Sequence, residues 1–278
     1  PVLPGAAVCE TGWEVAMRSL ILAVAMLSII GFPMTAVPGQ TPSDAAKAPP
    51  IVLRAARMLD VRTGEIIANP VLLIDGERLS AVGSGLPIPR GAQGIDLGNT
   101  TLLPGLIDVH IHPMGIGGAR NMLSRGVTTG RSMFSWNYTD VGLRALHARG
   151  DADIPTILAS GYPVLASPAR FKPDITALFL DHPDLDDLRS SDRIGPDGAR
   201  RIVRANASRG VDWIKVFANE RAGILEMDPS TRNLNDEELI AAVDEATRLG
   251  LPAGAHSYSD EGVSAAVKAG VRSIEHGS

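Results

Sequence analysis

Apolar runs and helix-like stretches alternate along the chain from residue 105 onward. Six apolar runs have the length of buried strands, and most precede a stretch whose apolar residues recur every three or four positions. The strands are predicted at 105–112, 127–133, 154–161, 211–218, 251–257 and 271–278. The helices are predicted at 117–126, 139–150, 196–210, 235–250 and 259–270, with a long loop from about 162 to 195. This alternation predicts an α/β fold built on a parallel sheet.

Two of the predicted helices carry clear signals for their ends. Pro196 and Gly210 flank one of them in the order expected of a helix start and a helix stop. Asn235 is the predicted N-cap of the next helix, and Glu238 stands three residues further on as its capping-box partner.

Residues 51–104 follow a different pattern. Short β-forming runs are broken by Gly, Pro and Asp, and Asp75-Gly76 between two apolar runs signals a hairpin. We therefore predict a small, mostly antiparallel β-unit over 51–104, followed by the α/β part over 105–278.

The six strands fall short of a closed barrel. An eight-fold (β/α) barrel needs two more units than these. Natural proteins avoid an uncovered parallel edge and the apolar surface beside it. The expectation is therefore an incomplete barrel, truncated at its C-terminus, with the remaining strands beyond Ser278.

The first fifty residues predict export. Met17 and Arg18 precede an apolar stretch over 20–32 and then small residues, as in a secretory signal peptide. We assign 1–16 to upstream sequence, 17–39 to the signal peptide and 40–50 to a linker, which makes the protein periplasmic or secreted. An uncleaved membrane anchor is the alternative. The apolar stretch is shorter than the roughly 20 residues of a membrane span, so no stable span is expected after cleavage.

Composition narrows the partners. The net charge is −5 and no basic stripe is present, which argues against nucleic acid. The chain has one cysteine, Cys9, so it can build neither an internal disulfide nor a cysteine zinc site.

Unusual polar residues stand at the ends of four predicted strands. His110 and His112 are two apart and therefore project from the same face of their strand. Lys215, His256 and His276 belong to three further strands. Each alone has a structural explanation, such as a polar strand end or a lysine reaching solvent. Together they lie where barrel enzymes build their active sites, at the carboxyl ends of the strands.

These residues lie in motifs that resemble the metal-dependent amidohydrolase superfamily, in its imidazolonepropionase-like and Xaa-Pro dipeptidase (prolidase)-like branch. The resemblance runs from about residue 51 to residue 278. It rests on "LLPGLIDVHIH", "SRGVTTGRSM", "GVDWIKVFAN" and "LPAGAHSYSDEGVSAAVKAGVRSIEHGS", with "VLLIDGERLSAVG" in the β-unit. The resemblance implies a (β/α)8 TIM barrel, here incomplete, beside a small β-sandwich.

The resemblance also implies a metal centre, here with two divalent ions, expected to be Zn²⁺. Carried over by position, His110 and His112 would bind the more buried ion, and His256 and His276 the second. Lys215, carboxylated on its amine, would bridge the two. An ammonium group cannot bind a cation, whereas a carbamate offers two anionic oxygens. Lys215, His256 and His276 are also the predicted catalytic residues.

One member of the family's set is expected beyond Ser278. It is an aspartate at the end of the eighth strand, which serves as metal ligand and proton shuttle. A general base contributes about 10²–10⁴-fold, so we expect the chain by itself to be nearly inactive and its full-length parent to be a hydrolase. Asp108 is either a carboxylate that supports the metal ligands or a half-buried residue without a catalytic role. Tyr162, at the start of the long loop, is a candidate substrate contact.

The predicted function is hydrolysis of an amide (C–N, non-ester) bond in a dipeptide or a cyclic amide, by metal-activated hydroxide. One alternative is a mononuclear deaminase of the same superfamily, with a free Lys215 and no second metal. Another is a non-catalytic barrel protein. The expected partner is a small-molecule or dipeptide substrate, and the sequence leaves a homo-oligomer open.

Overall fold

The computed structural model describes residues 48–166, 193–222 and 227–277. The chain divides into two compact units. One holds the residues up to Met58 and Ile67–Thr100, and the other holds Leu59–Ile66 and the residues from Thr101 on. The predicted upstream sequence, signal peptide and most of the linker lie outside the described residues. Within the described ranges, no helix combines the length and the apolarity needed to cross a membrane.

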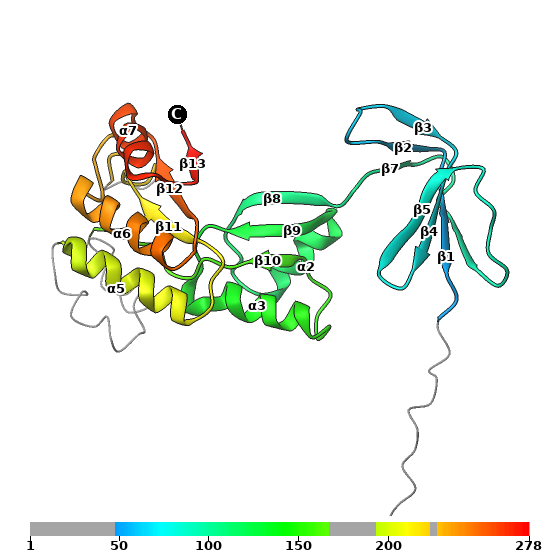
Figure 1. Ribbon diagram of the computed structural model, residues 1–278, viewed down its shortest axis with the longest axis horizontal. Helices are drawn as coiled ribbons and strands as arrows, with labels where there is room; N and C mark the ends of the chain where they lie inside the picture. Colours follow the sequence, from blue (N-terminus) through cyan, green and yellow to red (C-terminus); the bar gives the residue numbers. More distant parts are fainter. Residues whose placement is uncertain (1–47, 167–192, 223–226, 278) are drawn as a thin grey trace, which may run out of the picture. The chain divides into compact units, whose positions relative to one another are not determined.

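The first unit contains a four-stranded sheet in the order β5-β4-β1-β6 (Figure 1). Its strands are β1 (Ile51–Arg54), β4 (Pro70–Asp75), β5 (Arg78–Ser84) and β6 (Gln93–Asp96). β4 pairs antiparallel with both β1 and β5, whereas β1 pairs parallel with β6. Asp75 pairs with Arg78 across a turn in which Gly76 has a φ of 59°, so the predicted hairpin is confirmed.

Three short strands form a second small sheet in the order β3-β2-β7. They are β2 (Arg57–Leu59), β3 (Ile66–Ala68) and β7 (Thr101–Leu102). The β-rich character of this part of the chain agrees with its sequence pattern. These sheets do not by themselves confirm a two-layer β-sandwich.

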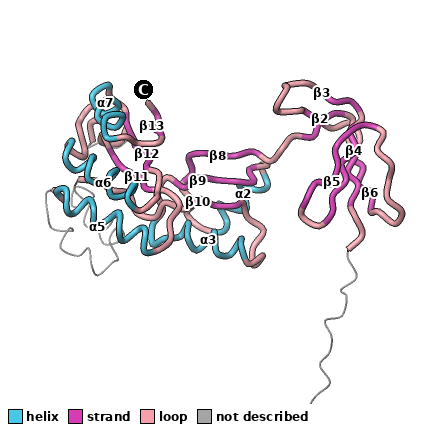
Figure 2. Tube along the Cα trace, viewed as in Figure 1, coloured by secondary structure: helices cyan, strands magenta, loops and turns pink. Residues whose placement is uncertain are grey.

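The second unit alternates strands and helices (Figure 2). The strands are β8 (Leu106–Ile111), β9 (Val127–Ser132), β10 (Thr156–Leu158), β11 (Ile214–Phe217), β12 (Ala253–Ser257) and β13 (Ser273–His276). The helices are α2 (Ile116–Ser124), the 3-10 helix η1 (Trp136–Tyr138), α3 (Thr139–Ala148), α5 (Gly195–Ser208), α6 (Asp236–Arg248) and α7 (Asp260–Ala269). Each strand and helix predicted for this part of the chain is present. Most of the predicted long loop lies outside the described residues.

The six strands of this unit follow one another in chain order and run parallel. They form the sheets β10-β9-β8 and β11-β12-β13. Val164, in the segment that follows β10, pairs with β11, because its N–H donates to the Lys215 carbonyl at 2.7 Å and its carbonyl accepts from the N–H of Phe217 at 3.0 Å. This order is consistent with an incomplete TIM barrel, and the described strands form no closed barrel.

Side chains of the first two strands meet those of the last two. Arg131 of β9 donates to the Ser273 hydroxyl of β13 at 3.2 Å. A Cβ on Gly254 of β12 would lie 2.6 Å from Cε of Met133, which follows β9, and 2.9 Å from the Ser273 hydroxyl oxygen of β13, so side chains from both ends of the sheet approach this glycine closely. The curvature of the sheet therefore brings residues far apart in sequence to one concave face.

Burial differs along the sheet. Every residue of β11 and β12 is buried, and the core around them includes apolar side chains of α5 and α6. In β8, Ile111 is buried but Ile107 is 68% exposed. The strands that carry Lys215 and His256 are thus the most rigidly enclosed ones.

Helix α6 begins as its sequence predicts. The Asn235 side chain accepts from the N–H of Glu238 at 2.8 Å, and the Glu238 carboxylate accepts from the N–H of Asn235 at 2.9 Å. This capping box satisfies two backbone donors that a helix start leaves free.

Candidate metal centre

Four histidines and one lysine from four strands line a single small cavity. Its volume is about 80 Å³. The lining residues are His110, His112, Phe134, Lys215, Phe217, Arg221, Ala222, His256, Tyr258 and His276. A water molecule has a share of liquid volume of about 30 Å³, so the cavity suits ions and a few waters. The structure thus brings the five predicted ligands together. The four histidines lie near or just past the carboxyl ends of their strands, whereas Lys215 is the second residue of β11.

The histidine rings form a chain across the cavity. The centroid of His110 lies 5.1 Å from that of His112 and 5.0 Å from that of His276. The rings of His276 and His256 are 4.7 Å apart. Four imidazoles at this spacing offer nitrogen ligands from both ends of the curved sheet.

In three of these imidazoles, one ring nitrogen lies within hydrogen-bond distance of a carboxylate or carbonyl oxygen, which can only accept a hydrogen bond. His110 Nδ1 lies 2.7 Å from Glu275 Oε2, and His112 Nδ1 lies 3.3 Å from the Phe134 carbonyl. His256 is held through its other nitrogen, Nε2, 3.3 Å from the Glu220 carbonyl. The held nitrogen must carry the proton, so the remaining nitrogen keeps a free lone pair.

Burial also keeps the histidines neutral. It lowers the pKa of His112 to about 4 and that of His256 to about 3, and it lowers the pKa of His276 as well. Positive charges nearby, Lys215 among them, act in the same direction. Neutral imidazole is the form that binds a metal ion.

Lys215 is a buried amine without a hydrogen-bond partner among the described residues. It is 1% exposed, and its Nζ lies 5.4 Å from the centroid of the Phe217 ring. Burial lowers the pKa of Lys215 to about 7, although the charge of Glu275 acts in the opposite direction. Burial therefore makes a large fraction of this amine neutral and nucleophilic near pH 7, where an exposed lysine is almost fully protonated.

A buried carboxylate, Glu275, was not singled out in the sequence. Its Oε2 accepts from His110, while its Oε1 accepts from Arg131 at 2.8 Å and from the Ser273 hydroxyl at 2.6 Å. Burial raises the pKa of Glu275, but the hydrogen bonds from His110 and Ser273 and the charge of Arg131 outweigh it and bring it to about 2. Glu275 is therefore an ionised acceptor directly beside a predicted metal ligand.

The donor set fits a bound divalent cation in its chemistry. Neutral imidazoles with free lone pairs and a buried deprotonatable amine are groups that zinc and similar ions accept as ligands, the amine after carboxylation. Among the described residues, however, no three His, Cys, Asp or Glu side chains already surround one point closely enough to hold an ion. The side chains form a site whose ligands are near each other and not yet in coordination geometry.

Two other predicted residues lie elsewhere. Tyr162 is 2% exposed and does not line the cavity, and its hydroxyl donates to the Asn137 side chain at 3.0 Å. The structure thus places it in the core instead of the cavity predicted to receive substrate. Asp108 is exposed and accepts from the N–H of His110 at 3.0 Å.

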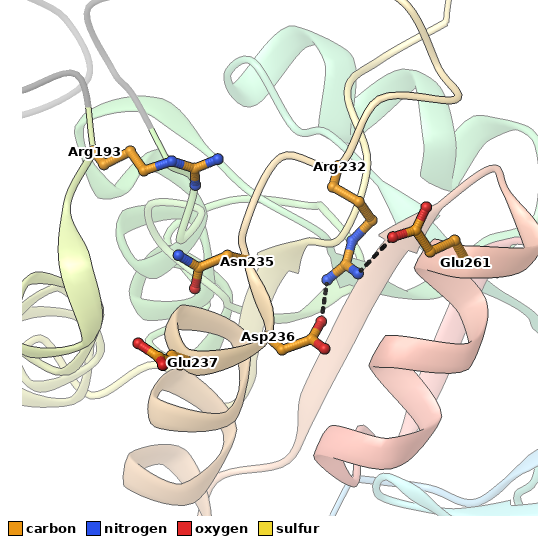
Figure 3. A pocket seen from close by; sticks show the side chains of 6 residues that line it. All are labelled: Arg193, Arg232, Asn235, Asp236, Glu237 and Glu261. Atoms are coloured by element: carbon orange, nitrogen blue, oxygen red, sulfur yellow. Dashed lines mark ion pairs between the residues drawn. The ribbon is translucent and has the colours of Figure 1, made fainter.

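A larger, open pocket of about 520 Å³ lies at the start of α6 (Figure 3). Arg232 pairs there with Asp236 at 3.0 Å and with Glu261 at 3.8 Å (Figure 3). Arg193 pairs with Glu238 at 3.0 Å. Because both arginines of this pocket already form ion pairs with neighbouring acids, the pocket gives no evidence of a bound anion.

Comparison with known proteins agrees with this geometry. Residues 101–278 match the model of the amidohydrolase family. Ochratoxinase from Aspergillus niger is 30% identical over 255 residues, which cover 77% of this chain and 51% of that protein. Allantoinase from Solibacter usitatus is 28% identical over 201 residues, which cover 72% of this chain and 38% of that protein.

A solved structure has the same arrangement of elements. A putative prolidase from Bifidobacterium longum superposes with a TM-score of 0.66 and 28% identity, covering 83% of this chain and 55% of that one. The chain thus spans about half the length of ochratoxinase and of this prolidase.

Proposed function

Because the chain belongs to the amidohydrolase family, we propose that its protein is a metal-dependent hydrolase of amide bonds in a dipeptide or a cyclic amide. The relatives named ochratoxinase, allantoinase and prolidase support an amide as the bond that is cleaved. In this proposal the cavity would hold two divalent ions, and zinc is the proposed metal among the several that imidazole ligands suit.

The single observation that carries the proposal is the amine of Lys215, which lies among four histidines and has no hydrogen-bond partner within the described part of the chain. A lysine kept neutral by burial can add to carbon dioxide. Its nitrogen forms a bond to the carbon and releases a proton to water, which leaves an anionic carbamate. That anion supplies the negative charge that the neutral histidines lack.

The chain's own residues would hold and orient the reacting groups. His110 and His112 would bind one ion through Nε2, and His256 would bind the other through Nδ1, since these are the nitrogens that their hydrogen bonds leave free. When bound, the ions would polarise the amide carbonyl and lower the pKa of a water. Phe134, Phe217 and Tyr258 enclose the cavity and limit the access of bulk water.

Arg221 supports a substrate that carries a negative charge. Its guanidinium lines the cavity, with its carbon 5.9 Å from the centroid of the Phe134 ring. Phe134 in turn lies 4.4 Å from the His112 ring. A carboxylate one residue away from the cleaved amide, as in a dipeptide or an N-acyl amino acid, would meet this charge.

We also propose that the whole protein contains an eight-stranded barrel, that residues 51–104 form part of a β-sandwich, and that residues 17–39 direct export. The proposed partner is the small-molecule or dipeptide substrate.

The test is hydrolysis by the full-length protein that carries this chain. Dipeptides, N-acyl amino acids and cyclic amides are incubated with the protein as purified, after chelation, and after chelation followed by Zn²⁺ and bicarbonate. We expect cleavage of an amide that is lost on chelation and restored only when both additions are made. Release of ammonia from an amine-bearing ring, independent of bicarbonate, would instead favour the mononuclear deaminase. No turnover of any amide by metal-loaded protein would favour a non-catalytic barrel.

A further inference from the structure

Glu275 is a buried carboxylate, 5% exposed, whose two oxygens make contacts of different kinds. Oε1 accepts from Arg131 and Ser273, at 2.8 and 2.6 Å. Oε2 lies 2.7 Å from His110 Nδ1, its one hydrogen-bond partner among the described residues. One oxygen anchors the carboxylate, and the other is directed at a histidine of the cavity.

Arg131, which holds Glu275, is itself held by three contacts. Arg131 also donates through Nε to the Val109 carbonyl at 2.7 Å and through Nη1 to Ser273 at 3.2 Å. Its guanidinium carbon lies 4.4 Å from the centroid of the Trp213 ring. The arginine is therefore held by β8, β13 and an aromatic face, and it offsets the charge of the buried carboxylate.

This geometry decides which nitrogen of His110 is available. An ionised carboxylate can only accept, so the proton of a neutral His110 must lie on Nδ1. The free lone pair is then on Nε2. Because an imidazole pivots easily about its side-chain bonds, the short bond to Glu275 also restricts the ring orientation.

We infer that Glu275, anchored by Arg131 and Ser273, is the positioning residue that fixes the tautomer and orientation of His110 for metal binding. This inference rests on the proposed metal centre. In this inference the two neighbouring residues of β13 have different roles. Glu275 orients His110, a ligand from β8, and His276 is itself a ligand.

The sharpest variant is Glu275→Gln, which keeps size and shape. Arg131 and Ser273 both donate to one oxygen, so the amide oxygen should stay with them and the amide NH₂ should face His110. An NH₂ is a donor, and His110 Nδ1 would have to accept from it. The imidazole proton would then move to Nε2, the nitrogen that the metal needs.

The first measurement is nitrogen-edited NMR of the histidine rings in the metal-free chain at mildly alkaline pH. The His110 signals are assigned by their loss in His110→Gln. We expect the Nδ1–H tautomer in the wild-type chain and the Nε2–H tautomer in Glu275→Gln. A wild-type His110 protonated on Nε2 would overturn the inference without use of any variant.

The second measurement is the affinity for Zn²⁺ alone, by competition with a chelating dye. Loss of a carboxylate that orients a metal ligand typically costs 10–100-fold in affinity, and we expect about that loss in Glu275→Gln. Glu245→Gln is the matched control, because Glu245 is also a buried carboxylate held by two arginines but lies on α6, outside the cavity. It should leave the affinity unchanged.

The outcomes separate this inference from the proposed function. No Zn²⁺ binding by the wild-type chain would contradict the metal centre, while the tautomer measurement would still test Glu275. Wild-type binding with an equal affinity in Glu275→Gln, and an unchanged His110 tautomer, would refute the role of Glu275 and leave the metal centre standing.

Discussion

At the scale of single residues, the backbone of His276 explains how two consecutive residues of β13 can both reach His110. Neighbouring residues of a strand normally point to opposite faces. Glu275 nevertheless hydrogen-bonds to His110, and the next residue, His276, has its ring 5.0 Å from the same imidazole. His276 has a φ of 72°, a left-handed conformation that is unfavourable for a residue other than glycine. Such strain is commonly kept at functional sites, and here it accompanies a His276 side chain that lines the cavity directly after Glu275.

The buried amine of Lys215 should destabilise the metal-free fold. We expect Lys215→Met to raise the free energy of unfolding of the metal-free chain by about 1–3 kcal/mol, because an unpaired polar group is replaced by an apolar one of similar length. Denaturant unfolding in the presence of a chelator measures this. A loss of stability would mean that the amine makes a stabilising contact, which would remove the reason for its modification.

Arg221 should select for charge in the substrate. In the full-length protein, Arg221→Gln should raise KM about 10–100-fold for a substrate with a free carboxylate, the range expected for a lost charged hydrogen bond. The same substrate capped as a carboxamide serves as the control and should respond little. Equal effects on both substrates would indicate that Arg221 shapes the cavity without recognising charge.

The residues that the sequence could and could not reveal differ in a physical way. Five residues are conspicuous because each is a metal-binding or basic residue within or at the end of a predicted strand: His110, His112, Lys215, His256 and His276. Glu275 and Arg131 are 144 positions apart, and only the curvature of the sheet brings them together. Strand alternation also predicts that Glu275 points away from the side of His276. The one local signal is the position of Glu275, an acid inside a predicted strand and directly before His276.

At the scale of elements, the capping box of α6 is a local feature that sequence predicts well. Both of its hydrogen bonds join residues three apart, so no long-range contact is needed to form it. The chain segment after β10 shows the opposite case. The sequence predicts a loop from Tyr162 onward, yet Val164 pairs with β11 and Tyr162 is buried in the core. Pairing with a strand about fifty residues away is not visible in the local pattern.

Removing the cap should destabilise the second unit. Asn235→Ala should lower the free energy of unfolding by about 1 kcal/mol, since the N–H of Glu238 loses its acceptor. Urea denaturation measures the change. Asn121→Ala on α2 is a matched control, because Asn121 is exposed in the middle of a helix and its replacement should be neutral or slightly stabilising.

Helices α5 and α6 are joined by a carboxylate whose protonation can be followed. Glu245 accepts from Arg204 of α5 at 2.7 Å and from Arg248 of its own helix at 3.1 Å. The hydrogen bonds from Arg248 and Arg204 lower the pKa of Glu245 from 4.5 to about 2. The unfolded chain therefore binds this proton more readily than the folded chain does, and the pair stabilises the fold above pH 4.5.

The contribution of Glu245 should disappear in acid. Glu245→Gln should cost about 1 kcal/mol at neutral pH, because both arginines are largely exposed and water weakens the pair. The difference from wild type should shrink as the pH falls from 4.5 towards 2. Urea unfolding over this range measures it, and a difference that stays constant with pH would contradict the assigned pKa.

At the scale of the whole molecule, the alternation of strands and helices was sufficient to predict the second unit. Apolar periodicity fixes which segments are strands, and parallel order follows from the helices between them. The depth of the cavity could not be predicted in this way. It depends on how strongly the sheet curves, which is set by packing such as Met133 against Gly254. For the same reason, the sequence indicated the candidate ligands but not the hydrogen bonds that orient them.

The metal content of the full-length protein that carries this chain tests the central claim most directly. The protein is stripped with a chelator, reconstituted with Zn²⁺ and bicarbonate, freed of excess metal and examined by elemental analysis beside Lys215→Met. Our account predicts two zinc ions per wild-type chain and fewer in Lys215→Met. A wild-type chain that retains no metal would contradict it, and the four histidines would then be only the polar ends of their strands.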